Sequence, residues 1–273
     1  MKYIKTVTVL VLTLILIFPL YWMAIGSFKT LTGIFHTPPD FLLRTPTLKN
    51  WATILGAPFL TVWTLNTLGI VAATLILCTA LTISAAYAFT FSRLRFKRVL
   101  FWIYMATIMF PRSAMTIPMF VTIRLLGLSG TRMAMVLPLI FSPILIFFAV
   151  GYMRTIPLAF IDSARIDGAK ERRILTSIIM PMCRPVIAVI AVTKTIEAFQ
   201  DYLWGMLVLT RDARKTLIVG IVETTLRNRI YQMENPIGLS LAGGMILFIP
   251  MFILFCIFQR QIVGGLKIGG IKE

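Results

Sequence analysis

The sequence is short of charged residues, and this shortage decides its general class. Only 14% of the 273 residues are Asp, Glu, Lys or Arg, whereas soluble domains contain about 25%. Hydrophobic residues make up 58% of the chain, and the mean hydropathy is +0.90. Such a chain cannot cover a water-facing surface with polar side chains, so the sequence predicts an integral membrane protein.

The residues that build catalytic and metal sites are also scarce. The single histidine, His36, excludes a histidine-cluster metal site, and Cys78, Cys183 and Cys256 are too far apart in sequence for a disulfide framework or a metal motif. The motifs of phosphate-loop nucleotide binding, zinc proteases and serine hydrolases are absent. Asp201 is the only candidate for an intramembrane aspartate, whereas a paired-aspartate hydrolase needs two. We therefore expect a chain that is not an enzyme and holds no cofactor or metal of its own.

Acidic residues are much rarer than basic ones: ten Asp and Glu stand against 27 Lys and Arg, a net charge of +17. In a soluble protein this excess would suggest nucleic acid as a partner. Here the basic residues gather at the ends of apolar runs, where anionic lipids and the topology rule favour them. We therefore expect contact with membrane lipid and no nucleic-acid partner.

Long apolar runs are what the sequence has in abundance. Five approach or exceed the ~20 residues that a helix needs to cross the hydrocarbon, and charges interrupt a sixth. The first run has the basic start of a signal peptide, but its length and the lack of a cleavage motif favour a retained span. The predicted fold is all-α: a polytopic membrane protein whose single transmembrane domain covers residues 1–273, with six spans at about 7–28, 64–91, 99–123, 133–153, 185–209 and 235–259.

Two features refine this topology. Pro111 and Pro118 interrupt the third span, so we expect it to be kinked or broken there. Six spans place both termini on one side, and that side has fifteen Lys and Arg against ten on the other. The excess predicts that both termini and the polar segment 154–184 are cytoplasmic.

The polar segment has the pattern of a helix, a tight turn and a second helix. Thr155 is a candidate N-cap for a first helix over 158–167. Gly168 then ends this helix, because glycine readily adopts the positive φ of such a turn. A second helix is predicted over 169–180, with Pro181 at its end.

Two interpretations of this segment stay open on the residues alone. Ala164 and Gly168 are four apart and small, so they form a face that another backbone can approach closely, and Phe160, Ile161 and Ile166 surround it with apolar side chains. This pattern suits a knob that enters a groove of a partner protein. The alternative is an ordinary loop that lies on the membrane through its basic residues.

The spacing of this segment resembles the cytoplasmic signature of ABC importer permeases, which has E-A-A, three residues, G, nine residues, I, one residue, and L-P. The matching positions here are Asp162, Ser163, Ala164, Gly168, Ile178, Met180 and Pro181, with Asp for Glu, Ser for Ala and Met for Leu. Other stretches, at 19–23, 48–51, 117–120 and 258–260, resemble the carbohydrate-uptake branch, and in particular the second permease subunit of maltose-type systems.

The resemblance implies a permease subunit of an ATP-driven importer for sugars or oligosaccharides, in a bacterial or archaeal cytoplasmic membrane. The implied partners are a homologous second permease subunit in a heterodimer, two ATPase subunits that bind ATP and Mg²⁺, and an extracytoplasmic solute-binding protein. The polar segment would be the coupling helix docked on an ATPase subunit. Its implied coupling residues are Asp162, Ser163, Ala164, Arg165, Ile166, Asp167, Gly168 and Ala169.

Charged side chains inside predicted spans are expensive and usually face a cavity or one another. Lys194, Glu197 and Asp201 have the spacing i, i+3 and i+7, so one helix face would carry all three. They form either a polar translocation path or structural ion pairs, including contacts to the partner permease. The candidates for the path are Arg112, Lys194, Glu197, Gln200, Asp201 and Trp204.

The cargo is also open at this stage. If Arg112 and Lys194 both line the path, the cargo could be anionic, such as an acidic oligosaccharide or a sugar phosphate. Outside this class, a secondary transporter, a channel or a membrane scaffold would need no ATPase subunit.

Overall fold

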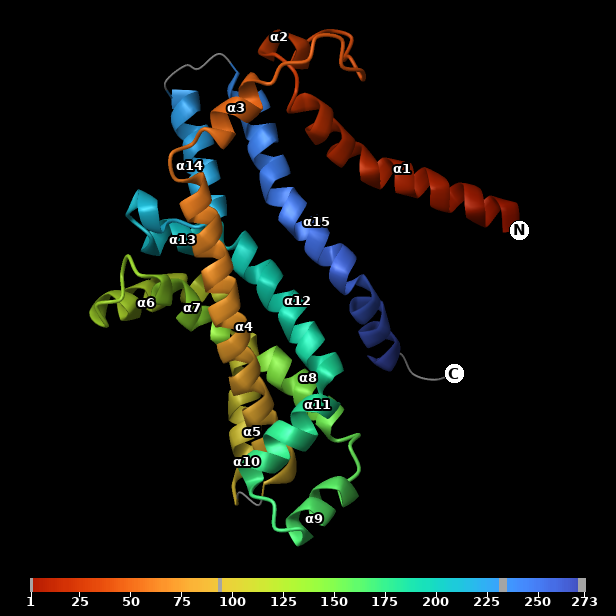
Figure 1. Cartoon of the computed structure of the whole chain (residues 1–273), viewed down its shortest axis with the longest axis vertical. Helices are drawn as coiled ribbons and strands as arrows, with labels where there is room; N and C mark the ends of the chain where they lie inside the picture. The colour runs from red at the N-terminus through yellow and green to blue at the C-terminus, as the bar shows by residue number, and fades with distance from the viewer. Residues whose placement is uncertain (1, 93–94, 231–234, 270–273) are drawn as a thin grey trace. The chain divides into compact units, whose positions relative to one another are not determined.

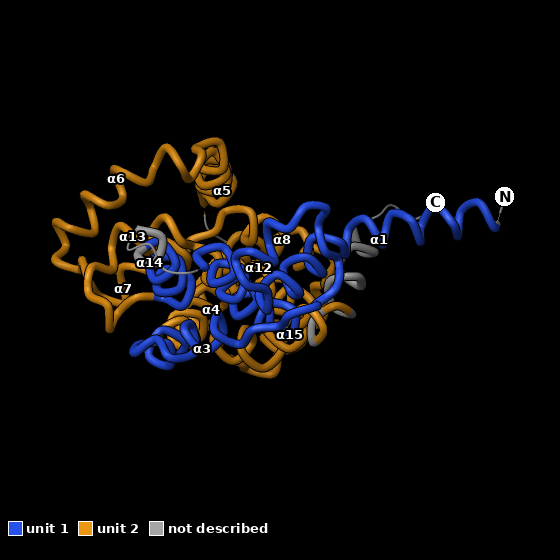
Figure 2. The backbone as a smooth tube through the Cα atoms, turned by 90° about the horizontal axis from the view of Figure 1, so that it is seen from above, with its two compact units in different colours: residues 1–64, 216–253 blue, residues 65–215, 254–273 orange. Residues whose placement is uncertain are grey.

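The computed structural model describes residues 2–92, 95–230 and 235–269, and within these residues every regular element is a helix (Figure 1). The chain forms two compact units, shown in Figure 2: the first contains the residues up to Thr64 and Thr216–Ile253, and the second contains Leu65–Lys215 and the chain from Leu254. The α-helices are α1 Lys2–Gly26, α2 Leu31–Ile34, α3 Lys49–Leu55, α4 Leu60–Phe91, α5 Lys97–Ala106, α6 Arg112–Leu125, α7 Arg132–Ile140, α8 Pro143–Met153, α9 Ala159–Ile166, α10 Glu171–Ile174, α11 Met180–Met182, α12 Arg184–Gln200, α13 Tyr202–Val208, α14 Leu217–Ile230 and α15 Pro236–Gly269.

Three of the helices are each long and apolar enough to cross a membrane: α1, α4 and α15. Three further pairs of shorter helices pass the same test together, but each pair is bent by more than 40°. The described residues therefore contain three candidate spans, or up to six if each bent pair is one span.

Proline accounts for two of the bends. The range 99–123 is divided between α5 and α6 at Phe110 and Pro111, with a bend of 103° that agrees with the predicted break. The range 133–153, predicted as one span, is divided between α7 and α8 with a bend of 44°. Here Ser142 is extended and Pro143 opens α8, because a proline at the first helical position gives up no hydrogen bond. The range 185–209 is also divided, because α12 ends at Gln200 and α13 begins at Tyr202.

The polar segment 154–184, which we call the coupling segment after the role that the resemblance implies, contains the predicted helix-turn-helix, but three local expectations were wrong. Thr155 is not an N-cap, because its hydroxyl donates to the carbonyl of Tyr152 and α9 begins only at Ala159. The second arm begins at Glu171 rather than at 169, and it passes through a π-helix, Leu175–Ile179. Pro181 does not end this arm but lies inside α11.

The bend after the second arm comes two residues later than predicted. It lies at Cys183, where the direction changes by 77° before α12. A π-helical turn before Pro181 shifts the hydrogen-bond pattern, which lets the chain tolerate a residue without an N–H.

One apolar cluster of the second unit anchors the coupling segment. It contains residues of α4, α5, α8 and α12 as well as Ile161 of α9 and Ile174 of α10. Ile161 and Ile174 are both completely buried. Each arm of the helix-turn-helix is thus fixed to the unit by an isoleucine.

The first unit is held by close packing and by a pair of asparagines. The amide of Asn50 donates to the carbonyls of Ser27 and Lys29, at 2.9 and 3.0 Å, and Asn235 donates to Lys29 at 2.7 Å. In α14, Gly220 lies so close to the ring of Trp63 that a Cβ atom there would be 2.2 Å from it. Only glycine permits this approach.

The predicted domain, residues 1–273, and the count of Lys and Arg include residues that lie outside the described part of the chain: 1, 93–94, 231–234 and 270–273. The three cysteines, by contrast, are described and free: Cys78 and Cys183 are buried and Cys256 is exposed. The described residues contain no group of His, Cys, Asp and Glu suited to a metal ion.

Candidate functional site

The turn of the coupling segment has the geometry that its glycine predicts. Gly168 has φ = +76°, and an added Cβ would meet no atom within 4 Å. Residue types with a side chain are therefore disfavoured there by backbone strain and not by lack of space within this chain. Asp167, the C-cap of α9, is exposed beside it.

The first arm has a buried face and an exposed apolar face. Ile161 is completely buried and Ala164 is 9% exposed, whereas Ile166 is 86% exposed and Phe160 is 51% exposed. Ala164 was expected to form part of a small docking face, and Ile161 was expected to surround it. Both expectations were wrong, because these two side chains pack into the unit's own core. Phe160 and Ile166 remain as apolar side chains that a partner could cover.

Charged residues connect the two arms. Arg165 donates through Nε to Oε1 of Glu171 at 2.9 Å, and its Nη1 lies 3.5 Å from Oδ1 of Asp162. The hydroxyl of Ser163 donates to the carbonyl of Ala159, so it faces its own helix. Asp162, Arg165 and Glu171 thus form one charged group across the turn.

Glu171 also connects the segment to α4. The hydroxyl of Tyr87 donates to Oε2 of Glu171, and Figure 1 shows α10 beside the C-terminal end of α4. The hydrogen bond from Tyr87, followed by that from Arg165, lowers the pKa of Glu171, while the carboxylate of Glu171 raises the pKa of Arg165. Both groups therefore remain charged over the whole physiological pH range.

A second feature of this unit is a groove of about 880 Å³ formed by α6, α7, α8, α12 and the chain before α6. We call it the apolar groove because most of its lining is hydrophobic: Ile108, Phe110, Met115, Met119, Ile123, Leu126, Leu137, Pro138, Phe141, Pro143 and Ile144. Three of the predicted path residues also line it, namely Arg112, Lys194 and Glu197.

The charged residues of the groove are paired. Lys194, only 3% exposed, bonds to Glu197 one turn later at 2.7 Å. Arg112 bonds to Asp201 at 2.6 Å, although 89 positions separate them. Each cation that was expected to favour an anionic cargo thus has a carboxylate partner within this unit.

The remaining path candidates are not brought into the groove. Asp201 lies in the break after α12, so it does not share a helix face with Lys194 and Glu197 as expected. Gln200 is the exposed last residue of α12. Trp204 is 3% exposed, and its indole N–H donates to the carbonyl of Ala134 at 2.9 Å. The geometry of Trp204 is that of a packing residue.

Sequence reasoning missed two residues of α4 that fix distant parts of the second unit. Tyr87 is 84 positions from Glu171, and no local pattern connects them. Asn66 donates to the carbonyls of Ala213 and Lys215, both at 3.0 Å. The only local indication for Asn66 was that a polar side chain occurs within an uncharged apolar run.

Residues 79–267 match the protein family described as binding-protein-dependent transport system inner membrane component. The match covers more than half of the chain and includes both the coupling segment and the apolar groove.

Individual relatives match almost the whole chain. It is 27% identical over 275 residues to the arabinooligosaccharides transport system permease protein AraQ of Halalkalibacterium halodurans, covering 100% of this chain and 97% of the relative. It is 30% identical over 267 residues to the trehalose/maltose transport system permease protein MalG of Thermococcus litoralis, covering 96% and 94%.

A solved structure shares the fold. It is a chain from a bacterial ABC transporter involved in the import of the acidic polysaccharide alginate. The TM-score is 0.83 with 21% identity, over 95% of both chains.

Proposed function

Because this chain belongs to the family of inner membrane components of binding-protein-dependent transport systems, we propose that its two sites have different roles in sugar import. The coupling segment binds the ATPase, and the apolar groove faces the cargo or the second permease subunit. The chain is the permease subunit of an ABC importer for sugars or oligosaccharides, as its relatives are. It is a transport subunit and not an enzyme. The observation that carries this function is the family match, which extends through both sites.

The coupling segment is the docking site for an ATPase subunit, which binds ATP and Mg²⁺. Three observations support this role: Phe160 and Ile166 are exposed apolar side chains, Ile161 and Ile174 fix the arms to the unit, and Gly168 makes the turn. When ATP closes the pair of ATPase subunits, the docked arms move, and the core cluster transmits this movement to α4, α5, α8 and α12. Ile161 and Ile174 make the arms rigid enough for that transmission.

The apolar groove is the part of this chain that faces the cargo or the second permease subunit. Lys194, Glu197 and the paired Arg112 are its charged lining residues. Trp204 does not line the groove and fixes α13 through its hydrogen bond to the carbonyl of Ala134. The two carboxylates offset the two cations, so we propose an uncharged sugar or oligosaccharide as the cargo, in preference to an acidic one. An apolar groove of this size also suits a helix of a homologous second permease.

Membership of the family implies an ATPase partner and a solute-binding partner. We propose that the complete importer has two ATPase subunits, a heterodimer of permeases and an extracytoplasmic binding protein. In the proposed topology, both termini and the coupling segment are on the cytoplasmic side of a bacterial or archaeal membrane, because the excess of Lys and Arg lies there.

The experiment that tests this function compares two glycines. Gly168→Asp should leave the permease in the membrane but abolish copurification of the ATPase and sugar-stimulated ATP hydrolysis, because it adds strain and a side chain at the docking surface. The matched control is Gly127→Asp, since Gly127 also has a positive φ, +68°, and open space around it, but it lies in the turn after α6.

We expect the control variant to retain the ATPase and its stimulation. Normal ATPase association in Gly168→Asp, or equal loss in both variants, would overturn the assignment of the coupling segment. Sugar uptake by the purified chain without any ATPase subunit would identify a secondary transporter or a channel instead.

A further inference from the structure

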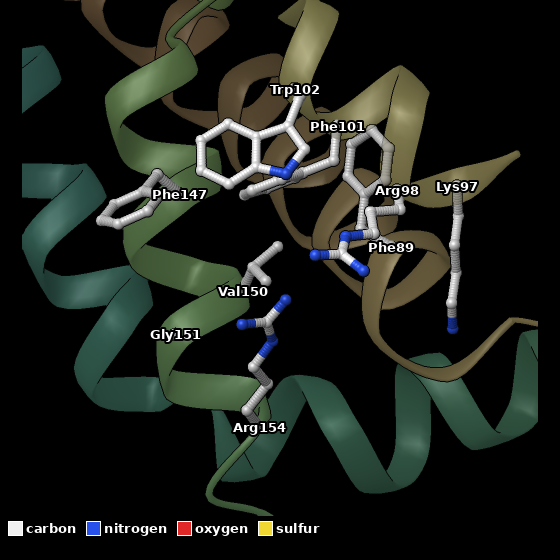
Figure 3. Close-up of a pocket in the computed structure, with 9 residues that line it drawn as sticks. All are labelled: Phe89, Lys97, Arg98, Phe101, Trp102, Phe147, Val150, Gly151 and Arg154. Atoms are coloured by element: carbon white, nitrogen blue, oxygen red, sulfur yellow. The ribbon is translucent and has the colours of Figure 1, made fainter. Parts of the chain in front are cut away.

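A second pocket of the second unit lies where α4 and α8 end and α5 begins. It has a volume of about 530 Å³ and is lined by residues of α4, α5 and α8 and by Arg154, the C-cap of α8. Its lining combines three cations with four aromatic side chains: Lys97, Arg98, Arg154, Phe89, Phe101, Trp102 and Phe147 (Figure 3). We call it the basic-aromatic pocket, and neither the coupling role nor the groove accounts for it.

The two arginines of this pocket have an unusual arrangement. Their guanidinium groups point toward one another across the pocket (Figure 3), although like charges repel. Among the residues that the structure describes, no carboxylate forms an ion pair with Arg98 or Arg154. An anion between the two groups would remove the repulsion, and the oxygens of a phosphate match the planar guanidinium donors.

Lys97 adds positive charge but has a separate structural task. Its ammonium donates to the carbonyls of Ser92 at 2.9 Å and Thr90 at 3.3 Å. These carbonyls belong to the C-terminal end of α4, where a lysine is favourable. Arg98 and Arg154 are therefore the two side chains available to a ligand.

The position of the pocket indicates the source of the anion. α4 ends at Phe91, α5 begins at Lys97 and α8 ends at Met153, so the pocket lies at the boundary between apolar and polar sequence. Trp102 and Phe147 are 62% and 55% exposed, as expected for rings beside lipid chains. Basic pockets between transmembrane helices commonly bind anionic headgroups.

We propose that the basic-aromatic pocket binds an anionic phospholipid. Arg98 and Arg154 hold its phosphate from two sides, and Trp102 and Phe147 contact its acyl chains. The bound lipid fills the space between the start of α5 and the end of α8. It thereby stabilises the end of the unit that carries the coupling segment.

Native mass spectrometry of the purified transporter complex, titrated with phosphatidylglycerol, tests this proposal. The variant Arg98→Gln/Arg154→Gln should bind phosphatidylglycerol about 30-fold more weakly, since each basic residue near the headgroup contributes about a fivefold factor. The variant Arg98→Lys/Arg154→Lys keeps both charges and should retain most of the binding. If the Gln variant does not assemble, Arg154→Gln alone should weaken binding about fivefold.

The matched control is Arg124→Gln/Arg132→Gln, which removes two exposed arginines outside the pocket. We expect it to bind phosphatidylglycerol like the unmodified protein. Two further titrations identify the ligand class: phosphatidylcholine, which has a phosphate but no net charge, and inorganic phosphate should both bind much more weakly than phosphatidylglycerol. Equal binding of phosphatidylglycerol by the Gln variant and the control, or equally tight binding of either comparison ligand, would overturn the proposal.

Discussion

Lys194 shows how the protein keeps a charge inside an apolar helix. It is almost completely buried, and Glu197 lies one turn further along α12 with its carboxylate at 2.7 Å. Removing one partner of such a pair leaves an uncompensated charge, whereas replacing both by apolar side chains is often nearly neutral for stability. The pair can therefore be tested separately for stability and for transport.

We expect Glu197→Gln to lower the free energy of unfolding by on the order of 2 kcal/mol, because the buried ammonium loses its partner. The double variant Lys194→Met/Glu197→Leu should regain most of this stability but lose sugar uptake, because both residues line the apolar groove. Thermal unfolding of the purified complex and uptake of labelled sugar give the two measurements.

The structural alternative makes a different prediction for the same double variant. If the pair only neutralises a buried charge, uptake recovers together with stability. That result would remove Lys194 and Glu197 from the substrate path and leave them as packing residues.

At the scale of elements, Glu171 joins the helix-turn-helix to α4. It accepts hydrogen bonds from Tyr87 and Arg165, and both lower its pKa below the ordinary value of 4.5. A carboxylate with a lowered pKa stabilises the folded state at pH values above its ordinary pKa, and this contribution is lost as the pH falls through the folded-state pKa. The connection should therefore be complete at neutral pH and weaken only in acid.

The variant Glu171→Gln should melt at a lower temperature than the unmodified protein at pH 7. The difference should begin to shrink below about pH 4.5 and disappear only once the pH has fallen through the lowered pKa of Glu171. The effect should be small, about 0.5 kcal/mol, because both partners of the ion pair are partly exposed. Asp167→Asn makes the same charge change in the same segment, and no ion pair of Asp167 is described; it should have little effect at any pH. A difference for Glu171→Gln that grows on acidification would contradict this account.

At the scale of the whole molecule, the distribution of Lys and Arg predicts which loops face the cytoplasm. Thr155, at the start of the coupling segment, and Ser129, in the turn after α6, are both exposed and lie on opposite sides in the proposed topology. In a Cys256→Ser background the two remaining cysteines are buried. Single cysteines at these two positions can therefore report on sidedness.

We expect a membrane-impermeant maleimide to label Ser129→Cys in intact cells and Thr155→Cys only after the membrane is opened. The expectation follows from the excess of basic residues on the side of the coupling segment. The reverse pattern would invert the topology, and labelling of both positions in intact cells would contradict the number of crossings between them.

The sequence by itself determined the features that depend on neighbouring residues. Apolar runs predict helices that suit a membrane, Pro111 predicts a break, Gly168 predicts a turn with positive φ, and the spacing of Lys194 and Glu197 permits a pair on one helix. Each of these depends on backbone sterics or on groups within one helical turn, so no tertiary contact is needed to infer it. The family resemblance followed from the same local spacings in the coupling segment.

Only the tertiary structure decided which distant residues meet. Arg112 pairs with Asp201, Tyr87 holds Glu171, and Trp204 is buried against the backbone at Ala134. These partners lie between 70 and 89 positions apart, and hydropathy cannot rank such pairings because every polar residue in a span would benefit from a partner. The same holds for Arg98 and Arg154, which lie at the ends of different helices and face one another only because α5 and α8 pack together.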